Sequence, residues 1–138
     1  MKNLLINIRT RGNHEFGFLS FFEASKDITF EIKRIYYTYK VPIDTKRGMH
    51  AHKKLQQALW CPYGKIEVIL DNGKEKTSYL LDSPEKSLLV PEGYWHDMYW
   101  RKEDSVLCVA ASDYYDEEDY IRDYDQFLNF VEEGYWND

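Results

Sequence analysis

The sequence constrains the fold most strongly through a succession of short apolar segments, each closed by a turn signal. Turn signals include Pro62-Tyr63-Gly64 and Asp71-Asn72-Gly73, of which the second is typical of a tight β-hairpin. The segments between the turns are rich in β-branched and aromatic residues. They cover residues 4–8, 16–22, 30–39, 47–57, 59–61, 65–70, 77–81, 87–90, 95–100 and 105–111. About nine or ten short strands at this spacing indicate an all-β sandwich or barrel.

The end of the chain departs from this pattern and predicts a helix. Residues 116–119 are all acidic, as the first turn of a helix favours. Gly134 is a stop signal. Between them, apolar residues recur at helical spacing, at Tyr120, Ile121, Tyr124, Phe127, Leu128 and Val131. We therefore expect a helix that begins in the acidic segment and packs its apolar face on the barrel or on a partner. The length of 138 residues predicts a single domain, residues 1–138.

Composition excludes some functions and indicates a compartment. The formal net charge of −6 argues against a nucleic-acid-binding protein, which needs a basic face. The two cysteines, Cys61 and Cys108, each lie in an apolar run and form no disulfide framework, which fits a reducing cytoplasm. The N-terminal residues have no signal-peptide pattern, and no apolar run is long enough to span a membrane. We expect a soluble, cytoplasmic protein.

The side chains best suited to catalysis or ligand binding lie in one stretch, residues 47–57, which contains His50 and His52. Side chains alternate along a strand, so two histidines at positions i and i+2 point to the same face. Neighbouring cationic side chains, Arg47, Lys53 and Lys54, are unusual in an acidic chain. Groups that move protons near neutral pH therefore lie beside groups that hold an anion.

The spacing around these histidines resembles the two motifs of the cupin superfamily, which fold as small jelly-roll barrels. His50-x-His52 is followed by Gln57 and Gly64, and Pro91-x-Gly93 is followed by His96. In metal-binding cupins the corresponding His, His, Glu and His bind a divalent ion. Here Gln57 replaces the glutamate, and a neutral amide is a weaker ligand for such an ion. Three histidines alone can bind zinc, so a metal-dependent cupin, for example a dioxygenase with His50, His52 and His96 as ligands, stays an alternative.

A second resemblance covers nearly the whole chain. Matching blocks lie at residues 32–37, 47–57, 81–84, 95–98 and 111–124. They resemble the cupin-type 3,4-ketoisomerases that act on dTDP-4-keto-6-deoxyglucose, in deoxysugar biosynthesis for glycans such as O-antigens and S-layers. The resemblance implies a homodimeric jelly roll without a required metal or other cofactor. It also implies that His50, His52 and Tyr36 line the catalytic site.

The reaction that this resemblance implies suits those residue types. A base removes the proton at C3, which the C4 ketone acidifies, and the enediolate is protonated at C4. Two histidines on one wall supply groups that titrate near neutrality, and one positioned acid or base contributes ~10²–10⁴-fold. A tyrosine hydroxyl, at Tyr36, can hydrogen-bond the developing oxyanion. Spacing leaves open which histidine acts first and on which face C4 receives its proton.

The substrate also carries a diphosphate and a thymine. Arginine binds phosphate oxygens best, so Arg34, Arg47 and Arg11 are candidate ligands of the diphosphate. On a strand Arg34 shares a face with Tyr36. The thymine would stack on an aromatic ring, with Trp95 as a candidate, and His96 would bind substrate or orient another group. For the individual residues, the alternatives are that the arginines form ordinary ion pairs and that the histidines have structural roles. For the whole chain, a third functional hypothesis is a non-catalytic cupin that binds sugar nucleotides.

Overall fold

Twelve strands and one α-helix account for most of residues 3–137, which are the residues that the computed structural model describes. Residues 1, 2 and 138 of the predicted domain lie outside this range. The strands are β1 (Leu5–Asn7), β2 (Arg9–Asn13), β3 (Gly17–Phe21), β4 (Arg34–Thr38), β5 (Lys46–His52), β6 (Gln57–Tyr63), β7 (Ile66–Asp71), β8 (Lys76–Leu81), β9 (Lys86–Val90), β10 (Trp95–Trp100), β11 (Val106–Ala111) and β12 (Tyr120–Ile121). The helix α1 (Tyr124–Glu132) follows a short 3₁₀ turn, η1 (Glu117–Asp119).

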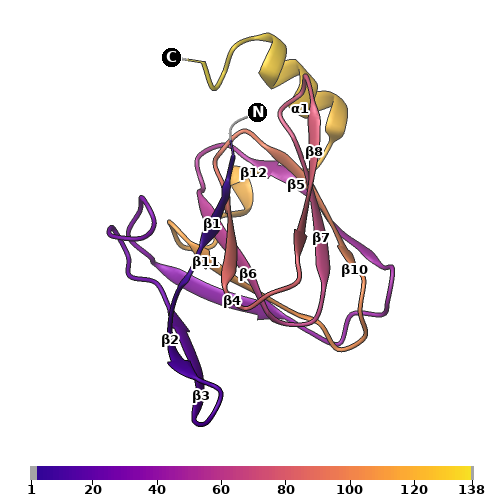
Figure 1. Cartoon of the computed structure of the whole chain (residues 1–138). Coiled ribbons are helices and arrows are strands. Elements are labelled where there is room, and N and C mark those ends of the chain that lie inside the picture. Colours follow the sequence, from indigo (N-terminus) through magenta and orange to yellow (C-terminus); the bar gives the residue numbers. More distant parts are fainter. Residues whose placement is uncertain (1–2, 138) are drawn as a thin grey trace.

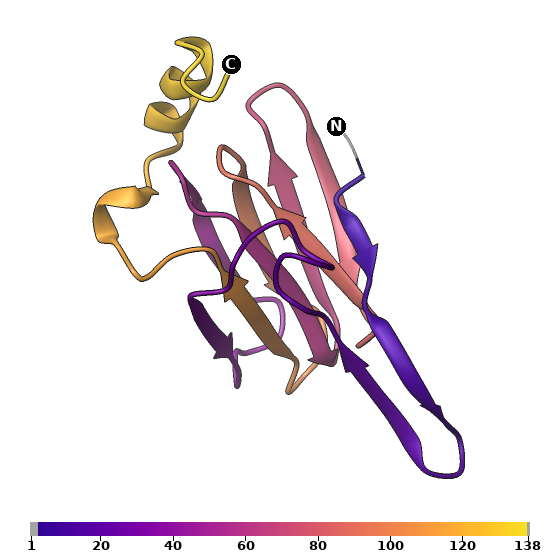
Figure 2. The same ribbon diagram turned by 90° about the vertical axis from the view of Figure 1, so that its left-hand side faces the viewer.

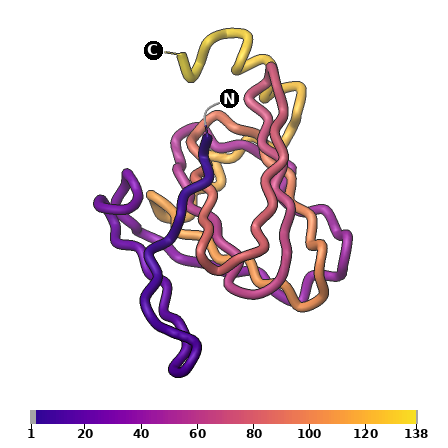
Figure 3. Tube along the Cα trace, in the orientation of Figure 1, coloured from indigo at the N-terminus to yellow at the C-terminus, as the bar shows by residue number. Residues whose placement is uncertain are grey.

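Two five-stranded antiparallel sheets curve around one apolar core (Figures 1 and 3). Their strand orders are β1-β9-β6-β11-β4 and β12-β5-β10-β7-β8. Both sheets contribute fully buried side chains to the core, among them Leu59 and Leu88 from the first and Val68, Leu70 and Trp100 from the second. This is the all-β barrel with a C-terminal helix that the sequence predicts.

The predicted hairpin at Asp71-Asn72-Gly73 is confirmed between β7 and β8, which pair in antiparallel register. Gly73 has a φ of +89°, a conformation that glycine adopts without strain. The Asn72 side-chain oxygen accepts hydrogen bonds from the backbone N–H groups of Lys74 and Glu75. The turn residues therefore fix the register that buries Ile66, Val68 and Leu70 on one face of β7.

The predicted start of the helix at residues 116–119 is wrong. Residues 117–119 form the 3₁₀ turn η1, and Tyr120 and Ile121 form β12, which pairs with His52 and Ala51 of β5. The α-helix begins only after Asp123, whose side chain caps it by accepting the Gln126 N–H. Pairing with β5 satisfies backbone groups that a longer helix would have bonded internally, and it buries Ile121 under α1. Gly134, at a φ of +74°, ends the helical segment as predicted.

The N-terminal hairpin of β2 and β3 projects from the barrel, at the end opposite to α1 (Figures 1 and 2). It forms a two-stranded sheet of its own. Its tip carries exposed apolar side chains: Phe16 is 84% exposed and Leu19 is 61% exposed. No helix within residues 3–137 is long and apolar enough to cross a membrane.

Candidate active site

The register between β5 and β10 brings three histidines together. His50 lies directly opposite His96 in the antiparallel pair, and His52 follows two residues later on the same face of β5. The rings of His50 and His96 are 4.4 Å apart between centroids, and those of His50 and His52 are 4.9 Å apart. Ala51, between the two, points to the opposite face and packs under α1. The predicted shared face of His50 and His52 is therefore confirmed.

A β-bulge at Gly48 and Met49 turns Arg47 toward the same face. The register shifts there, because Asp97 pairs with Gly48 whereas His96 pairs with His50, so Met49 is the extra residue. Gly48 and Met49 have φ values of +87° and +59°. Simple alternation would put Arg47 on the face opposite to His50, and one extra residue reverses that. A Cβ on Gly48 would lie 2.7 Å from the carbonyl oxygen of His96, so the bulge requires glycine.

A cavity of about 350 Å³ opens in front of these side chains. Its size falls within the range of small-molecule sites. Strand β4 contributes Arg34 and Tyr36, which share a face as predicted, and Thr38 on the same face. Other polar or aromatic side chains in the wall are Arg47, His50, Gln57, His96, Trp100, Tyr115, Tyr120 and Arg122. His52 is 3% exposed, lies behind His50, and lines an adjoining cavity that shares Arg34 and Tyr120.

The three histidines are neutral at physiological pH. Burial lowers the pKa of His52 to about 2 and that of His96 to about 3, and in each case a neighbouring histidine adds to the effect. Burial also lowers the pKa of His50, and the Arg122 charge contributes. The Nδ1 of His50 lies 3.0 Å from the Gly48 carbonyl oxygen, which can only accept a hydrogen bond. His50 therefore carries its proton on Nδ1 and offers the lone pair of Nε2.

Tyr36 presents a hydroxyl proton to the cavity. Its oxygen accepts a hydrogen bond of 2.8 Å from the Gln57 side-chain amide. Desolvation and the neighbouring Tyr120 raise the pKa of Tyr36, so the hydroxyl is protonated at neutral pH. Because Gln57 occupies the oxygen as a donor, the proton of Tyr36 is available for an oxygen of a bound ligand.

Two arginines supply positive charge without a neutralising partner. Within residues 3–137, neither Arg34 nor Arg47 forms an ion pair with an acidic side chain, and the Arg34 Nε is buried without a hydrogen-bond partner. Arg34 lies over the Tyr36 ring, 5.1 Å from its centroid. A third cavity arginine, Arg122, forms a two-pronged pair with Glu117, at 2.9 and 3.0 Å. The cavity thus offers Arg34 and Arg47 to an anion.

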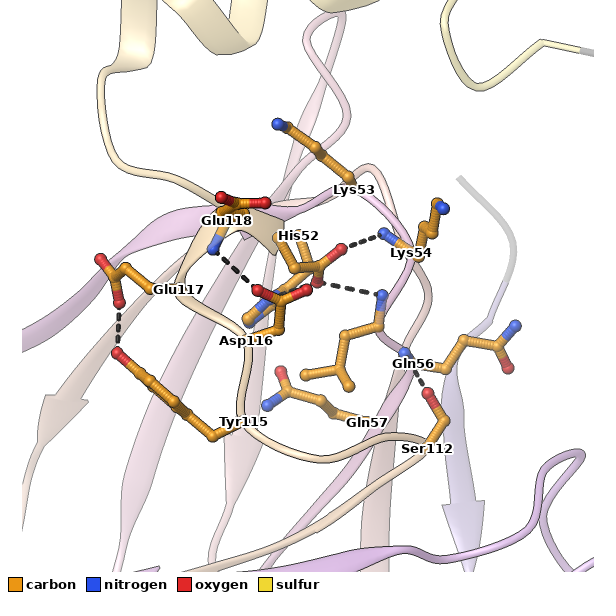
Figure 4. A network of polar contacts seen from close by, with 12 residues as sticks. His52, Lys53, Lys54, Gln56, Gln57, Ser112, Tyr115, Asp116, Glu117 and Glu118 are labelled. Carbon is orange, nitrogen blue, oxygen red and sulfur yellow. Dashed lines mark hydrogen bonds and ion pairs between the residues drawn. The ribbon is translucent and has the colours of Figure 1, made fainter.

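The segment before β12 wraps the loop that follows β5 (Figure 4). Asp119 accepts the backbone N–H of Lys54 at 2.9 Å, and its other carboxylate oxygen lies 3.1 Å from the Nδ1 of His52. Nearby, the Ser112 hydroxyl accepts the Gln56 N–H, and the Tyr115 hydroxyl donates to Glu117. These contacts hold the end of β5 against residues 112–119.

The structure does not bring two predicted ligands to the cavity. Trp95 precedes His96 on β10, so its side chain lies on the opposite face, where it packs against Tyr124 and Phe127. It is 7% exposed and belongs to the core under α1. Arg11 lies on the projecting β2–β3 hairpin, outside the cavity of its own chain, with its guanidinium 5.8 Å from the Phe21 ring centroid.

Three cavity residues, Tyr115, Tyr120 and Arg122, escape prediction from the sequence alone. Tyr115 directly precedes the acidic residues 116–119, and Tyr120 and Arg122 follow them, where helical spacing hides the strand β12. The Tyr120 ring lies 4.5 Å from that of His52 and 5.0 Å from that of His50. The block at residues 111–124 is the only sequence signal that connects this segment to the histidines.

The histidines could also bind a metal ion, since one ring nitrogen of each lies within 4.8 Å of the others. Neutral imidazoles are suitable zinc ligands. The residue at the fourth cupin position, Gln57, instead directs its amide to Tyr36. The candidate metal donor set thus consists of three imidazoles without a carboxylate.

Comparisons with known proteins agree with this geometry. A curated protein named TDP-4-oxo-6-deoxy-alpha-D-glucose-3,4-oxoisomerase, from Aneurinibacillus thermoaerophilus, is 44% identical over 131 residues, which cover 95% of this chain and 94% of that protein. A 3,4-ketoisomerase from Helicobacter canadensis superposes with a TM-score of 0.88 at 40% identity and covers 93% of this chain and 96% of its own.

The sugar 3,4-ketoisomerase QdtA from Thermoanaerobacterium thermosaccharolyticum, solved with TDP, has a TM-score of 0.90 at 39% identity. The match covers 94% of this chain and 93% of QdtA, and a mutant of QdtA is described in complex with TDP-4-keto-6-deoxyglucose. These likenesses confirm the predicted cupin jelly roll and the resemblance to sugar 3,4-ketoisomerases. A family model described as FdtA, WxcM-like, C-terminal, matches residues 1–132, and the chain belongs to that family.

Proposed function

We propose that this chain is a sugar 3,4-ketoisomerase that moves the carbonyl group of TDP-4-keto-6-deoxyglucose from C4 to C3 in deoxysugar biosynthesis. The observation that carries the proposal is the cavity itself, where neutral histidines, a protonated tyrosine and two arginines without an ion-pair partner among residues 3–137 converge. Proton transfer between two carbons requires this combination of a base, a hydrogen-bond donor and an anion site.

His50 is the group placed to take the C3 proton, because it lines the cavity and offers a lone pair on Nε2. As the C3–H bond breaks, its electrons form the C3=C4 double bond and the C4 carbonyl becomes an enolate oxygen. The Tyr36 hydroxyl donates a hydrogen bond to that oxygen. A donor of this kind contributes about 10²–10³-fold.

His52 serves as the second proton-transfer group. The C4 enolate oxygen takes up a proton to give the enediol. The enediol then loses the proton of its C3 hydroxyl, the electrons return as a C3 carbonyl, and C4 takes up a proton. His50 and His52 lie close enough to share this work, with 4.9 Å between ring centroids. No electron leaves the substrate, and one proton is removed for each proton returned, so the reaction needs no redox cofactor.

The diphosphate of the substrate binds Arg34 and Arg47. An arginine that already has a carboxylate partner is less available, which favours these two over Arg122. Arg34→Met and Arg47→Met variants should raise KM more than they lower kcat, because both side chains act on a part of the substrate that does not react.

The decisive experiment is NMR spectroscopy of the product that forms from TDP-4-keto-6-deoxyglucose. We expect a 3-keto isomer that incorporates solvent deuterium at C4, and its stereochemistry identifies the face that is protonated. A 4-keto sugar that stays unchanged with folded protein would refute the proposal. His52→Asn should lose isomerisation, and full activity would refute a role of His52 in proton transfer.

A metal-dependent cupin is the second candidate, favoured by the three histidine nitrogens within 4.8 Å of one another. Elemental analysis of the purified protein, combined with activity after chelation, separates the two candidates. Near-stoichiometric iron, manganese or zinc, with activity lost to the chelator, would favour the second candidate.

We further propose that the protein is a homodimer joined through the β2–β3 hairpin. A projecting hairpin with Phe16 and Leu19 exposed at its tip leaves apolar area that a second copy would cover. An apolar groove at its base, lined by Phe18, Phe22, Ile32 and Trp60 among others, continues that surface. Sedimentation velocity should give a dimer, and Leu19→Glu a monomer. Ile43→Glu, a change at an apolar side chain that is 56% exposed away from the hairpin, is the control.

We also propose one catalytic domain spanning residues 1–138 and a cytoplasmic location. The second of these rests on Cys61 and Cys108, which are both free thiols. Fractionation of the cells that make the protein tests the location.

A further inference from the structure

We propose that Asp119 is the positioning residue of the site, which sets the tautomer and orientation of His52. The proposal rests on the proposed role of His52 in the isomerisation, and it assigns a function to a residue outside the wall of the main cavity. Its basis is a set of contacts around one carboxylate at the end of η1.

The first contact fixes where the proton of His52 lies. The Asp119 Oδ2 atom is 3.1 Å from the Nδ1 of His52. An ionised carboxylate only accepts hydrogen bonds, so Nδ1 must carry the proton of the neutral ring. The other nitrogen, Nε2, then holds a lone pair. It is buried without a hydrogen-bond partner in the described part of the chain, beside the rings of His50 and Tyr120.

Further contacts prevent the carboxylate from turning away. Its Oδ1 accepts the Lys54 N–H at 2.9 Å, and its Oδ2 also accepts the Leu55 N–H at 3.3 Å. The backbone carbonyl of Asp119 accepts the Lys53 N–H at 2.9 Å. The Asp119 side chain is 14% exposed. Three consecutive amides of the loop after β5 therefore hold Asp119, and Asp119 in turn holds the histidine at the end of that strand.

Replacing this carboxylate by an amide would reverse the tautomer of His52. In Asp119→Asn, the amide oxygen at the Oδ1 position would keep the shorter, 2.9 Å contact with the Lys54 N–H and give up the longer, 3.3 Å contact of Oδ2 with the Leu55 N–H. The NH₂ group at the Oδ2 position would then face Nδ1 and require an acceptor there. His52 would then carry its proton on Nε2 and lose the lone pair that faces His50. Because Asp119 does not line the main cavity, the change should act on kcat and leave KM nearly unchanged.

Asp116→Asn is the matched control. It removes the same charge three residues earlier in the same segment, and asparagine preserves the cap that Asp116 provides by accepting the Glu118 N–H. We expect Asp119→Asn to lower kcat by about 10²-fold with KM changed less than threefold. Asp116→Asn should stay within threefold of the wild type in both. Equal losses in the two variants, or a loss carried by KM alone, would overturn the proposal.

Nitrogen-15 NMR of the histidine rings tests the tautomer without any assay of activity. In the wild type, the His52 signals, assigned by their disappearance in His52→Gln, should show a protonated Nδ1 and an unprotonated Nε2. Asp119→Asn should exchange the two. A wild-type His52 protonated on Nε2 would overturn the proposal even if the variant failed to fold. An inactive wild-type protein with the expected tautomer would instead count against the proposed isomerase function.

Discussion

Acidification should destabilise this protein through His52 and His96, which lie buried beside the catalytic cavity. The two side chains are 3% and 2% exposed, and their pKa values in the fold are about 2 and about 3, against 6.5 for an ordinary histidine. Below pH 6.5 the unfolded chain therefore binds protons that the folded chain does not. A state that binds more protons gains free energy as the pH falls, so the free energy of unfolding must decrease.

The size of this decrease in the free energy of unfolding follows from how far the pH falls below 6.5, the pKa of a histidine in the unfolded chain. At pH 5 the unfolded histidines are about 1.5 pH units below their pKa, which corresponds to ~2 kcal/mol for each residue at ~1.36 kcal/mol per unit. Both folded pKa values lie well below 5, so neither buried ring is protonated there. Between pH 8 and pH 5 His96 should thus remove ~2 kcal/mol, a large share of the ~5–15 kcal/mol of a typical domain. His52 should remove at most the same amount, because the Asp119 carboxylate 3.1 Å from its Nδ1 favours the protonated ring.

Urea unfolding at pH 8 and pH 5 measures this loss directly. Other groups titrate in the same range, so the test is the change that one substitution makes. His96→Gln removes a titrating ring and should shrink the difference between the two pH values by ~2 kcal/mol. Ser87→Ala, a change at a buried side chain that does not titrate in this range, should leave the wild-type difference unchanged. If His96→Gln retained the full wild-type difference, buried neutral histidines would not control the acid stability.

Three further predictions concern catalysis and the bulge. The lowered pKa of His50 should place the acidic limb of the kcat/KM profile below pH 6.5, and a limb above that value would contradict a buried neutral base. Tyr36→Phe should lower kcat by about 10²–10³-fold in steady-state assays. It should also lower the thermal midpoint, because the buried Gln57 amide loses its acceptor. Gly48→Ala should lower the free energy of unfolding by ~1–3 kcal/mol more than Gly17→Ala. Both glycines have a positive φ, but only at Gly48 would a Cβ meet backbone, the carbonyl of His96, so equal losses would mean that the bulge tolerates a side chain.

Local periodicity accounts for the parts of the site that the sequence predicts. Residues two apart on a strand share a face, and this alone places His50 with His52 and Arg34 with Tyr36. The turn chemistry of Asp71-Asn72-Gly73 likewise locates a hairpin without knowledge of the rest of the fold. These inferences need only a few neighbouring residues, and the structure confirms them.

Local periodicity cannot predict features that depend on pairing between distant segments of the chain. The apolar positions at Tyr120 and Ile121 fit a helix as well as a strand, and only the presence of β5 as a partner favours the strand. Alternation counted from His50 would turn Arg47 away from the cavity, and the bulge that reverses this is visible only in the register with β10. Asp119 lies 67 residues from His52, so nothing local connects the two.

The same burial explains both the chemistry of the site and its sensitivity to acid. A histidine exposed to water would be partly protonated at pH 6.5, whereas desolvation keeps the imidazoles here unprotonated and available as bases. The unfolded chain is free of this constraint, so every buried base that stays neutral in the fold is also a site where acid favours unfolding. The carboxylate of Asp119 determines which ring nitrogen of His52 carries the proton and which one keeps a lone pair. Substitutions at Asp119 and His96 should therefore separate the two properties: Asp119 controls the tautomer used in proton transfer, and His96 contributes to the loss of stability in acid.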